Sequence, residues 1–257
     1  MTELTWLGRS CFELRTCRGQ RVLFDPHLAL YRAQQGDDYP PPDMICVSHG
    51  HLDHFADVPD LIRGDSPALV VATPRLCRAL RELIPETQHR LFPLPWDDHF
   101  EVEGIPFFAF RSPPMETSLY AMFEEFGAER VDAFLQAFRQ LADDILYLPL
   151  TSFGLESDGV RLLHFVAESE SHESAVDVAD IGARFDPDVA LISVNPGEEA
   201  HAAAHAAALG ARLVIPHHYR AYGRLPGADL DRFASILNDL APDCQLSVLD
   251  EMETISL

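Results

Sequence analysis

The order of hydrophobic and polar positions predicts that the chain opens with short strands and continues with alternating strands and helices. Residues 3–7, 11–15 and 21–24 are hydrophobic runs separated by polar turns, which is typical of a β-meander. Residues 44–47 form an uninterrupted hydrophobic run, which indicates a buried strand. We therefore expect an all-β opening followed by a layered α/β domain.

Later segments continue this alternation. Residues 57–63 and 73–83 are predicted helices on either side of a predicted strand at 68–72. Thr73 followed by Pro74 is a typical helix start. Further strands are predicted at 105–110, 145–150, 160–167, 188–194, 212–215, 245–249 and 253–257, and further helices at 198–209 and 229–240. We expect the last two strands to complete a second sheet.

Residues 118–142 carry two hydrophobic stripes at helical spacing, which predict two amphipathic helices. The stripes are Leu119, Met122, Phe123 and Phe126, then Phe134, Leu135, Phe138 and Leu141. Two interpretations stay open, namely extra core or a cap over a binding site. We predict a single domain over residues 1–257 with a helical cap insertion at about 115–144.

A polar cluster directly follows the predicted strand at 44–47. His49, His51 and His54 stand at positions i, i+2 and i+5, with Asp53 among them. No regular helix or strand puts all four on one face, so we expect a loop that wraps them around a point. Neutral imidazole and carboxylate are ligands that zinc, manganese and iron prefer. The cluster therefore predicts a metal site; the alternative is a solvated histidine-rich turn.

Residues 49–54 match the HxHxDH signature of the metallo-β-lactamase superfamily. Residues 5–12 and 22–26 resemble that family's opening strands and their strand-ending Asp-Pro, and residues 213–219 resemble the strand and turn that carry its last metal histidine. On these motifs the chain is identified as a member of the superfamily and resembles its lactonase-like, UPF0173-type metal-dependent hydrolases. The resemblance weakens between residues 111 and 172.

The resemblance implies an αββα sandwich, in which two mixed β-sheets carry helices on both outer faces. It also implies a hydrolase in which metal-activated water attacks a small ester, lactone or phosphodiester. The implied cofactor is one or two divalent ions, with zinc first and manganese or iron as alternatives. A non-hydrolytic or single-metal member stays as an alternative, and a nuclease is the weaker one.

The ligands that the resemblance implies belong to two metal positions. Asp53, His54 and His218 make up the second position, and His49 and His51 supply two ligands of the first. Asp53 is also expected to hold or accept the proton of the nucleophile. The full predicted set is His49, His51, Asp53, His54, Glu168 and His218.

Two departures from the family pattern concern these positions. The loop after residues 105–110 contains no histidine, and Glu116 is the candidate replacement ligand. Glu168 stands where the family has a bridging aspartate, and His172, four residues on, is a further candidate ligand. Arg220 and Arg224 follow the last motif and are predicted to clamp a carboxylate or phosphate of the substrate; the alternative is that they balance an acidic surface.

Other polar residues are assigned less direct roles. Asp25 is either an acceptor that fixes the tautomer of a ligand histidine or a strand-capping residue. Five other histidines are interpreted as surface, core-edge or exposed-helix residues, namely His27, His89, His99, His201 and His205; for His27 the alternative is that it lines the pocket.

Composition narrows the function further. The chain has 257 residues, 47% of them hydrophobic, and a formal net charge of −22, which argues against nucleic acid and anionic membranes as partners. It contains no lysine, which excludes Schiff-base chemistry and a P-loop. A small-molecule substrate is the expected partner, and a homo-oligomer stays open.

Cysteine usage and the first residues bear on location. Five scattered cysteines do not form a disulfide framework and are interpreted as reduced thiols, with Cys46 in the core. No signal peptide and no hydrophobic stretch of about 18 residues is evident. A cytoplasmic location is the default expectation.

Overall fold

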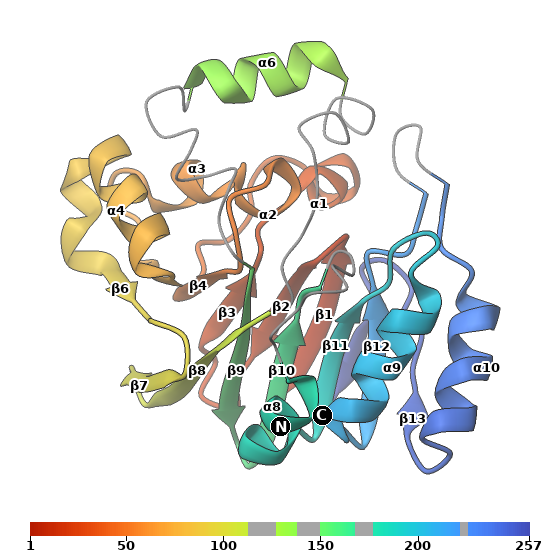
Figure 1. Cartoon of the computed structure of the whole chain (residues 1–257). Coiled ribbons are helices and arrows are strands. Elements are labelled where there is room, and N and C mark those ends of the chain that lie inside the picture. Colours follow the sequence, from red (N-terminus) through yellow and green to blue (C-terminus); the bar gives the residue numbers. More distant parts are fainter. Residues whose placement is uncertain (113–126, 138–149, 168–176, 222–225) are drawn as a thin grey trace. The chain divides into compact units, whose positions relative to one another are not determined.

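Two seven-stranded sheets, each in its own compact unit, form the frame of this computed structural model (Figure 1). Residues 1–98 and 250–257 form most of the first unit, and described residues between His99 and Leu249 form most of the second. The structure describes residues 1–112, 127–137, 150–167, 177–221 and 226–257.

The first sheet contains seven strands: Glu3–Gly8 (β1), Cys11–Arg15 (β2), Arg21–Phe24 (β3), Met44–Val47 (β4), Leu69–Ala72 (β5), Leu91–Pro93 (β6) and Thr254–Ser256 (β14). Their order is β14-β1-β2-β3-β4-β5-β6. The first three form the predicted antiparallel meander, and β3 to β6 pair in parallel. All four residues of β4 are buried, so the segment that follows it starts from a rigid strand.

Helices of the first unit follow its parallel strands. They are Ala29–Gln35 (α1), Leu52–Phe55 (α2), Val58–Ile62 (α3) and Pro74–Leu83 (α4), with a 3₁₀ helix at Pro85–Arg90 (η1). The predicted start of α4 is confirmed, because Thr73 Oγ1 accepts a hydrogen bond from the backbone N–H of Leu76 at 3.2 Å. Such a cap satisfies a backbone donor that would otherwise lack an intrahelical partner.

The second sheet contains Asp98–Val102 (β7), Ile105–Arg111 (β8), Thr151–Ser157 (β9), Val160–Phe165 (β10), Val189–Ser193 (β11), Leu213–His217 (β12) and Gln245–Leu246 (β13). Their order is β13-β12-β11-β10-β9-β8-β7. Strands β8, β9 and β10 are antiparallel neighbours, whereas β10 to β13 pair in parallel. Parallel strands end at one edge, where the following loops gather.

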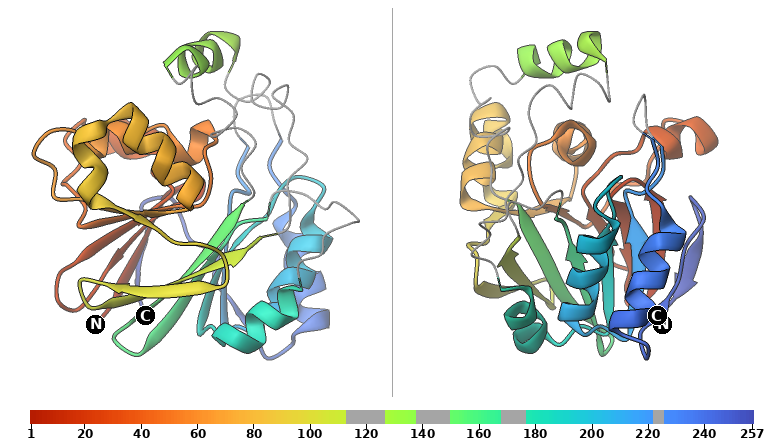
Figure 2. Two further views of the ribbon diagram at one scale, coloured as in Figure 1. Left: turned by 60° about the vertical axis from the view of Figure 1, so that its left-hand side comes forward. Right: turned by 45° about the vertical axis from the view of Figure 1, so that its right-hand side comes forward.

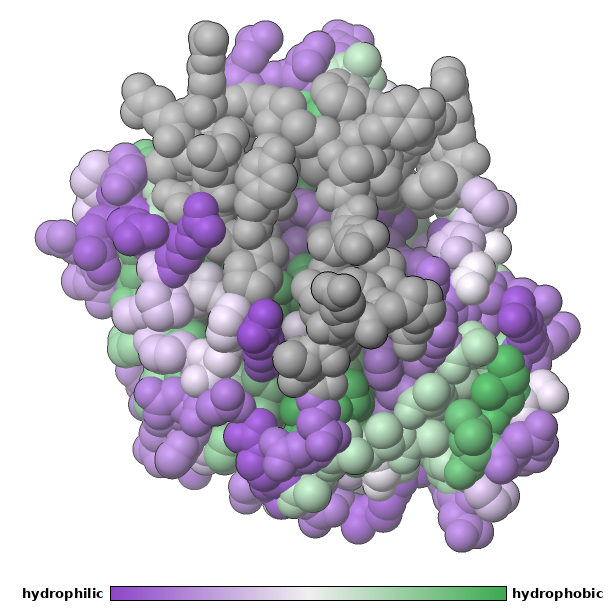
Figure 3. Space-filling model, in the orientation of Figure 1, coloured by the Kyte–Doolittle hydropathy of each residue, from purple (hydrophilic) through white to green (hydrophobic). Residues whose placement is uncertain are grey.

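Three helices of the second unit, Val178–Phe185 (α8), Glu199–Leu209 (α9) and Leu230–Leu240 (α10), lie side by side (Figures 1 and 2). Gly182 lets α8 approach α9 closely, since a Cβ atom there would lie 2.6 Å from the carbonyl oxygen of Leu209. Figure 3 shows a face that is largely hydrophilic outside its grey atoms, with paler hydrophobic residues over the alanine-rich α9 and its neighbour α10.

Several sequence predictions need correction. The strand predicted at 145–150 falls mostly outside the described residues, and the strand before the turn at Asp158 is β9 at residues 151–157. The strand predicted at 253–257 joins the first sheet, because β14 pairs with β1 in the register Glu3↔Ser256. The helices α1 and α8 and the strands β6 and β7 are present although the sequence patterns did not predict them.

The predicted helical insertion is described only in part. Ala128–Ala137 (α6) is helical and covers the beginning of the second hydrophobic stripe, whereas residues 113–126 and 138–149 lie outside the described residues. In the described part of the chain no helix is long and hydrophobic enough to cross a membrane. The five cysteines carry no disulfide, and Cys46 is buried as expected.

Candidate metal centre

Four predicted ligand residues lie together at the end of β4 in the first unit. His51 forms the N-cap of α2 with extended dihedral angles (φ −69°, ψ 155°), and Asp53 and His54 lie within that helix. The ring centroids of His49 and His51 are 4.5 Å apart, and those of His49 and His54 are 4.1 Å apart. All four side chains belong to buried residues. The loop therefore brings three imidazoles and one carboxylate to a single buried point.

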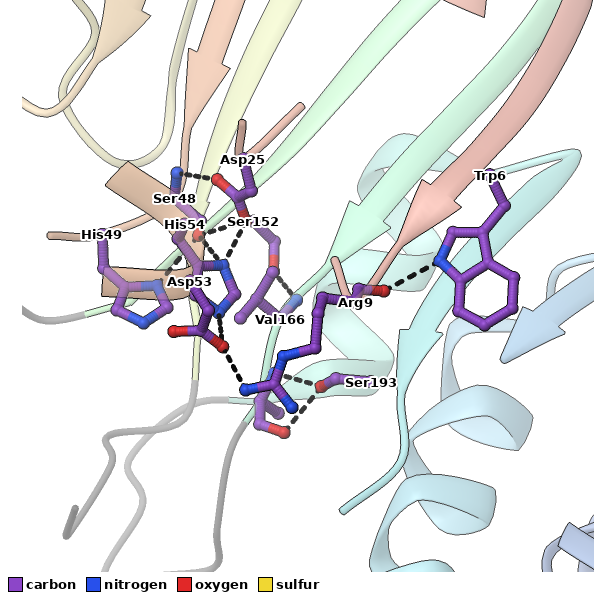
Figure 4. A network of polar contacts seen from close by, with 11 residues as sticks. Trp6, Arg9, Asp25, Ser48, His49, Asp53, His54, Ser152, Val166 and Ser193 are labelled. Carbon is purple, nitrogen blue, oxygen red and sulfur yellow. Dashed lines mark hydrogen bonds and ion pairs between the residues drawn. The ribbon is translucent and has the colours of Figure 1, made fainter. Parts of the chain in front are cut away.

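The Asp25 carboxylate anchors this loop from the end of β3 (Figure 4). It accepts hydrogen bonds from Ser48, at 2.7 Å from the backbone nitrogen and 2.6 Å from Oγ, and from His54 Nδ1 at 2.7 Å. Asp25 has a φ of +42°, a conformation that non-glycine residues seldom adopt and that often marks functional sites. Of the two roles left open by the sequence, the structure shows Asp25 as an acceptor for a candidate ligand histidine.

The hydrogen bonds around Ser48 fix the tautomer of His49 as well. A serine hydroxyl has one proton to donate, and Ser48 directs it to the Asp25 carboxylate, which in its ionised form can only accept. Ser48 Oγ also lies 2.9 Å from His49 Nδ1, so that nitrogen must donate to the hydroxyl oxygen. His49 therefore carries its proton on Nδ1, and its Nε2 keeps the lone pair that a metal ion requires.

His54 is held in a strongly negative environment. Burial lowers the pKa of its imidazole, but the carboxylates of Asp53 and Asp25 raise it more, so that the pKa of His54 lies well above its ordinary value. Its Nε2 lies 3.4 Å from Asp53 Oδ2. The two carboxylates therefore favour the protonated form of this ring, and a metal ion that binds Nε2 competes with a proton.

Arg9 is a residue of this cluster that the sequence patterns did not single out. Its Nη2 donates to Asp53 Oδ2 at 2.7 Å, and the two residues are 8% and 4% exposed. An arginine in a turn between two strands ordinarily reads as a surface residue, so no signal in the sequence separates Arg9 from the exposed arginines. The buried ion pair belongs to the candidate metal centre nonetheless, because Asp53 is one of its predicted ligands.

Asp57 connects the loop after Asp25 to the helices after the histidine cluster. Its carboxylate accepts from the backbone nitrogen of Leu28 at 2.7 Å and from Arg32 Nη1 at 2.6 Å. Between these anchors His27 is only 3% exposed, which corrects its interpretation as a surface residue. The loop that begins at Asp25 is therefore fixed at both ends.

In the second unit, the predicted ligand His218 follows directly on β12. It has a φ of +64°, and its Nδ1 lies 2.7 Å from the Asn195 side-chain oxygen Oδ1. Since an amide oxygen only accepts, Nδ1 donates and Nε2 is the nitrogen with the lone pair. His218 is thus prepared in the same tautomer as His49. The sequence resemblance selected His218 but gave no sign of Asn195, which is 23 residues earlier.

Two further histidines of the second unit were missed. His164 in β10 and His217 in β12 are fully buried, and their rings stack with centroids 5.1 Å apart and an interplanar angle of 26°. Nearby, Ser193 Oγ donates to the carbonyl oxygen of Ala167 at 2.7 Å and accepts from its backbone nitrogen at 2.9 Å. A histidine within a hydrophobic strand resembles an ordinary core residue in sequence, which explains why His164 was not selected.

The remaining residues weighed in the sequence analysis are either described away from the histidine cluster or lie outside the described residues. Arg220 is exposed, and its guanidinium carbon lies 5.8 Å from the ring centroid of Tyr219. His201 Nδ1 lies 2.6 Å from Glu198 Oε2 on α9, and the His205 ring contacts Phe165. Outside the described residues are Glu116, Glu168, His172 and Arg224.

The residues present in the first unit fit a divalent transition-metal ion. Imidazole Nε2 atoms and a carboxylate are the donors that zinc, iron and manganese take. The hydrogen bonds at Nδ1 of His49 and His54 are of the kind that orients metal-binding histidines through their second nitrogen. Asp53, His54 and the two other histidines therefore present a donor set of the appropriate chemistry.

Comparisons with known proteins agree with this chemistry. Residues 20–124 match the family model described as beta-lactamase superfamily domain. A UPF0173 metal-dependent hydrolase from Rubrobacter xylanophilus is 29% identical over 275 aligned residues, which cover 99% of this chain and 96% of the relative. Its name gives the enzyme class that the sequence predicts.

Solved structures show the same fold. A metallo hydrolase from the archaeon Ignicoccus hospitalis has a TM-score of 0.71 at 16% identity, covering 99% of this chain and 97% of its own. The metallo-beta-lactamase fold protein YhfI from Bacillus subtilis has a TM-score of 0.67 at 11% identity, covering 99% and 98%. These matches confirm the predicted fold class of two mixed sheets with helices. With its histidine motif, its fold and relatives that match along nearly the whole length, the chain is similar to metal-dependent hydrolases of the metallo-β-lactamase superfamily.

Proposed function

We propose that this protein is a hydrolase that uses a divalent metal ion to activate water against a small ester, lactone or phosphodiester. The observation that carries the proposal is the connected set of hydrogen bonds from His49 through Ser48 and Asp25 to His54. A set that holds two buried histidines through Nδ1, with His54 Nε2 only 3.4 Å from the Asp53 carboxylate, has no evident use in a core without a cation, since buried polar groups are costly.

We further propose that His49, His51, Asp53, His54 and His218 are the ligands, with zinc as the first expectation and manganese or iron as alternatives. His218 is included because of its sequence motif and because Asn195 holds its Nδ1. A bound divalent ion would act as a Lewis acid and would lower the pKa of a water molecule toward neutrality. Asp53 is proposed to accept or hold the proton of the attacking water.

Residues beyond the histidine cluster complete the proposal, and all of them except Arg220 lie outside the described part of the chain. Glu168 is the proposed bridging carboxylate, and Glu116 and His172 are proposed as additional ligands. Arg220 and Arg224 are proposed to bind an anionic group of the substrate through paired hydrogen bonds. The exposure of Arg220 is compatible with such contact, because a guanidinium that meets substrate must be accessible.

The experiment that tests the function joins metal analysis with hydrolysis. Protein purified without added metal is analysed for zinc, manganese and iron, and then assayed with p-nitrophenyl acetate, a γ-lactone and bis(p-nitrophenyl) phosphate. We expect bound metal and turnover that a chelator abolishes and that returns when the same metal is added. Bound metal without turnover on any substrate class would favour a non-hydrolytic member of the superfamily.

Single substitutions test the ligand assignment. His54→Ala and His218→Ala are each expected to lose metal, because each removes a donor. His201→Ala is the matched control, since His201 is paired with Glu198 on α9 and should keep wild-type metal content. Equal metal retention in all three variants would contradict the assignment.

A further inference from the structure

Arg9 is fixed by the turn in which it lies. It follows β1 and has a φ of +53°, and its carbonyl oxygen accepts a hydrogen bond of 2.9 Å from the buried indole N–H of Trp6. Only 8% of the residue is exposed. The guanidinium is therefore delivered to one place by a backbone conformation that few residues other than glycine adopt, and it does not reach its partner through a flexible surface side chain.

Its partner is the one carboxylate among the candidate ligands of the first unit. Arg9 Nη2 lies 2.7 Å from Asp53 Oδ2, whereas the other carboxylate oxygen points away from Arg9 in Figure 4. The Asp53 oxygen bound by Arg9 is also the one 3.4 Å from His54 Nε2. Because Arg9 binds Oδ2, the oxygen Oδ1 is the one that a cation could bind at a greater distance from the guanidinium.

Arg9 and the imidazoles of this cluster respond differently to a metal ion. An imidazole binds a metal ion in its neutral form and so gives up any second proton. The charge of Arg9 stays, because a guanidinium does not lose its proton in proteins. A positive charge that shares a buried carboxylate with a divalent ion repels that ion, and low exposure leaves little water to screen the repulsion.

We propose that Arg9 is a permanent countercharge for Asp53 that weakens metal binding at this centre and keeps the metal-free site stable. The inference rests on the proposed function, since it concerns the same ion. Without Arg9 the buried Asp53 would depend more strongly on the metal for compensation, so the ion would bind more tightly and the metal-free protein would be less stable. Arg9 is in this sense a positioning residue that sets an affinity, and it is not a ligand.

The test compares three variants of the full-length protein. Arg9→Gln keeps an N–H donor near Asp53 but removes the charge, whereas Arg9→Lys keeps the charge and loses the planar fork. Arg90→Gln is the matched control, because Arg90 is 7% exposed and donates to the backbone oxygens of Ile62 and Ser66 rather than to a candidate ligand among the described residues. Each protein is stripped of metal and titrated with Zn²⁺ against a chromophoric chelator, and with Co²⁺ while its d–d absorption spectrum is recorded.

We expect Arg9→Gln to bind Zn²⁺ at least tenfold more tightly than the wild type, with a larger rise in melting temperature on metal addition. Arg9→Lys should stay within about threefold of the wild type, and Arg90→Gln should lose stability without a change in affinity or in the Co²⁺ spectrum. Weaker or unchanged binding in Arg9→Gln would overturn the proposal, as would an equal tightening in Arg9→Lys.

Other outcomes remain decisive. If Arg9→Gln does not fold without metal but folds in its presence, while Arg9→Lys folds without it, the countercharge role is supported. If Arg9→Gln fails to fold under both conditions, Arg9→Met is purified from cells grown with added metal and its Zn²⁺ affinity is measured instead. An affinity equal to the wild-type value overturns the proposal, and a tenfold tighter affinity supports it. Absence of Zn²⁺ and Co²⁺ binding by the wild type would overturn the proposed function and this inference together, whereas equal affinities with metal bound overturn this inference alone.

Discussion

Asp25 and His54 are 29 residues apart in the chain, and a hydrogen bond of 2.7 Å joins the carboxylate of one to Nδ1 of the other. The carboxylate also accepts the hydroxyl proton of Ser48, which in turn accepts from His49. One carboxylate thus orients two candidate metal ligands, His54 directly and His49 through Ser48.

Ser48→Ala should separate the two halves of this arrangement. The variant loses the acceptor for His49 Nδ1 but keeps the bond between Asp25 and His54, so we expect metal affinity to fall by about tenfold. Asp25→Asn disturbs both histidines and should cost more, up to about 100-fold. Competition with a chelator measures both values.

The control for these variants is Asp60→Asn, which removes only an exposed ion pair with Arg63. Metal affinity in that variant should equal the wild-type value. If Ser48→Ala and Asp25→Asn bind metal as tightly as Asp60→Asn, the hydrogen bonds have no part in preparing the ligands.

The carboxyl group of Glu13 should make the free energy of unfolding depend on pH. Burial raises the pKa of its carboxyl group, but hydrogen bonds from Arg21 and from Tyr39, at 2.5 Å from the phenol oxygen, lower it more, so the pKa of Glu13 lies below its ordinary value. A depressed pKa stabilises the folded state above the unfolded-state value, and this contribution disappears as the pH falls through the folded-state value. Glu13→Gln should therefore lose about 2 kcal/mol of unfolding free energy at pH 7.

The difference in unfolding free energy between the wild type and Glu13→Gln should become smaller in acid, because the Glu13 carboxylate of the wild type is then protonated and, like glutamine, uncharged. Urea unfolding at pH 7 and at a pH below the ordinary glutamate value measures both gaps. Glu3→Gln, at an exposed position of β1, serves as the control and should show little change at either pH. A gap for Glu13→Gln that is constant with pH would contradict the electrostatic account.

Gly182→Ala should destabilise the protein although alanine is ordinarily the better helix former. Exchange of glycine for alanine inside a helix gains about 1 kcal/mol when space allows. Here the new Cβ would lie 2.6 Å from the Leu209 carbonyl oxygen and 2.8 Å from that of Ala208. Because these are backbone atoms of α9, we expect a net loss of about 1 to 3 kcal/mol.

Urea unfolding measures this loss, with Ala183→Gly at the neighbouring exposed position as the control for helix propensity. That control should lose about 1 kcal/mol for the ordinary reason. A stability of Gly182→Ala at or above the wild-type value would show that α8 and α9 have room that the structure does not indicate.

The sequence predicted those features that depend on local patterns. Alternating hydrophobic runs located β1 to β4, and Thr73 with Pro74 marked the start of α4. The histidine spacing after β4 identified four side chains that the structure does bring together. In each of these cases the determining residues are close neighbours in the chain.

Features that depend on distant partners were not predictable from one sequence. The partner of Asp53 is Arg9, 44 residues away, and an arginine in a turn carries no mark of burial. The strand β14 was assigned to the wrong sheet because a short hydrophobic run does not indicate which sheet edge the strand pairs with. His164 escaped notice because its hydrophobic neighbours Leu163 and Phe165 resemble core sequence.

The pairing of β14 with β1 has a consequence for biosynthesis. Thr5 and Thr254 bond through their hydroxyl oxygens across 249 residues of chain, so the outer edge of β1 has no strand to pair with while the nascent polypeptide is short. At ordinary translation speeds that interval is roughly 12 to 50 s. An open strand edge invites pairing with other chains, so aggregation during translation is the hazard that this late closure creates.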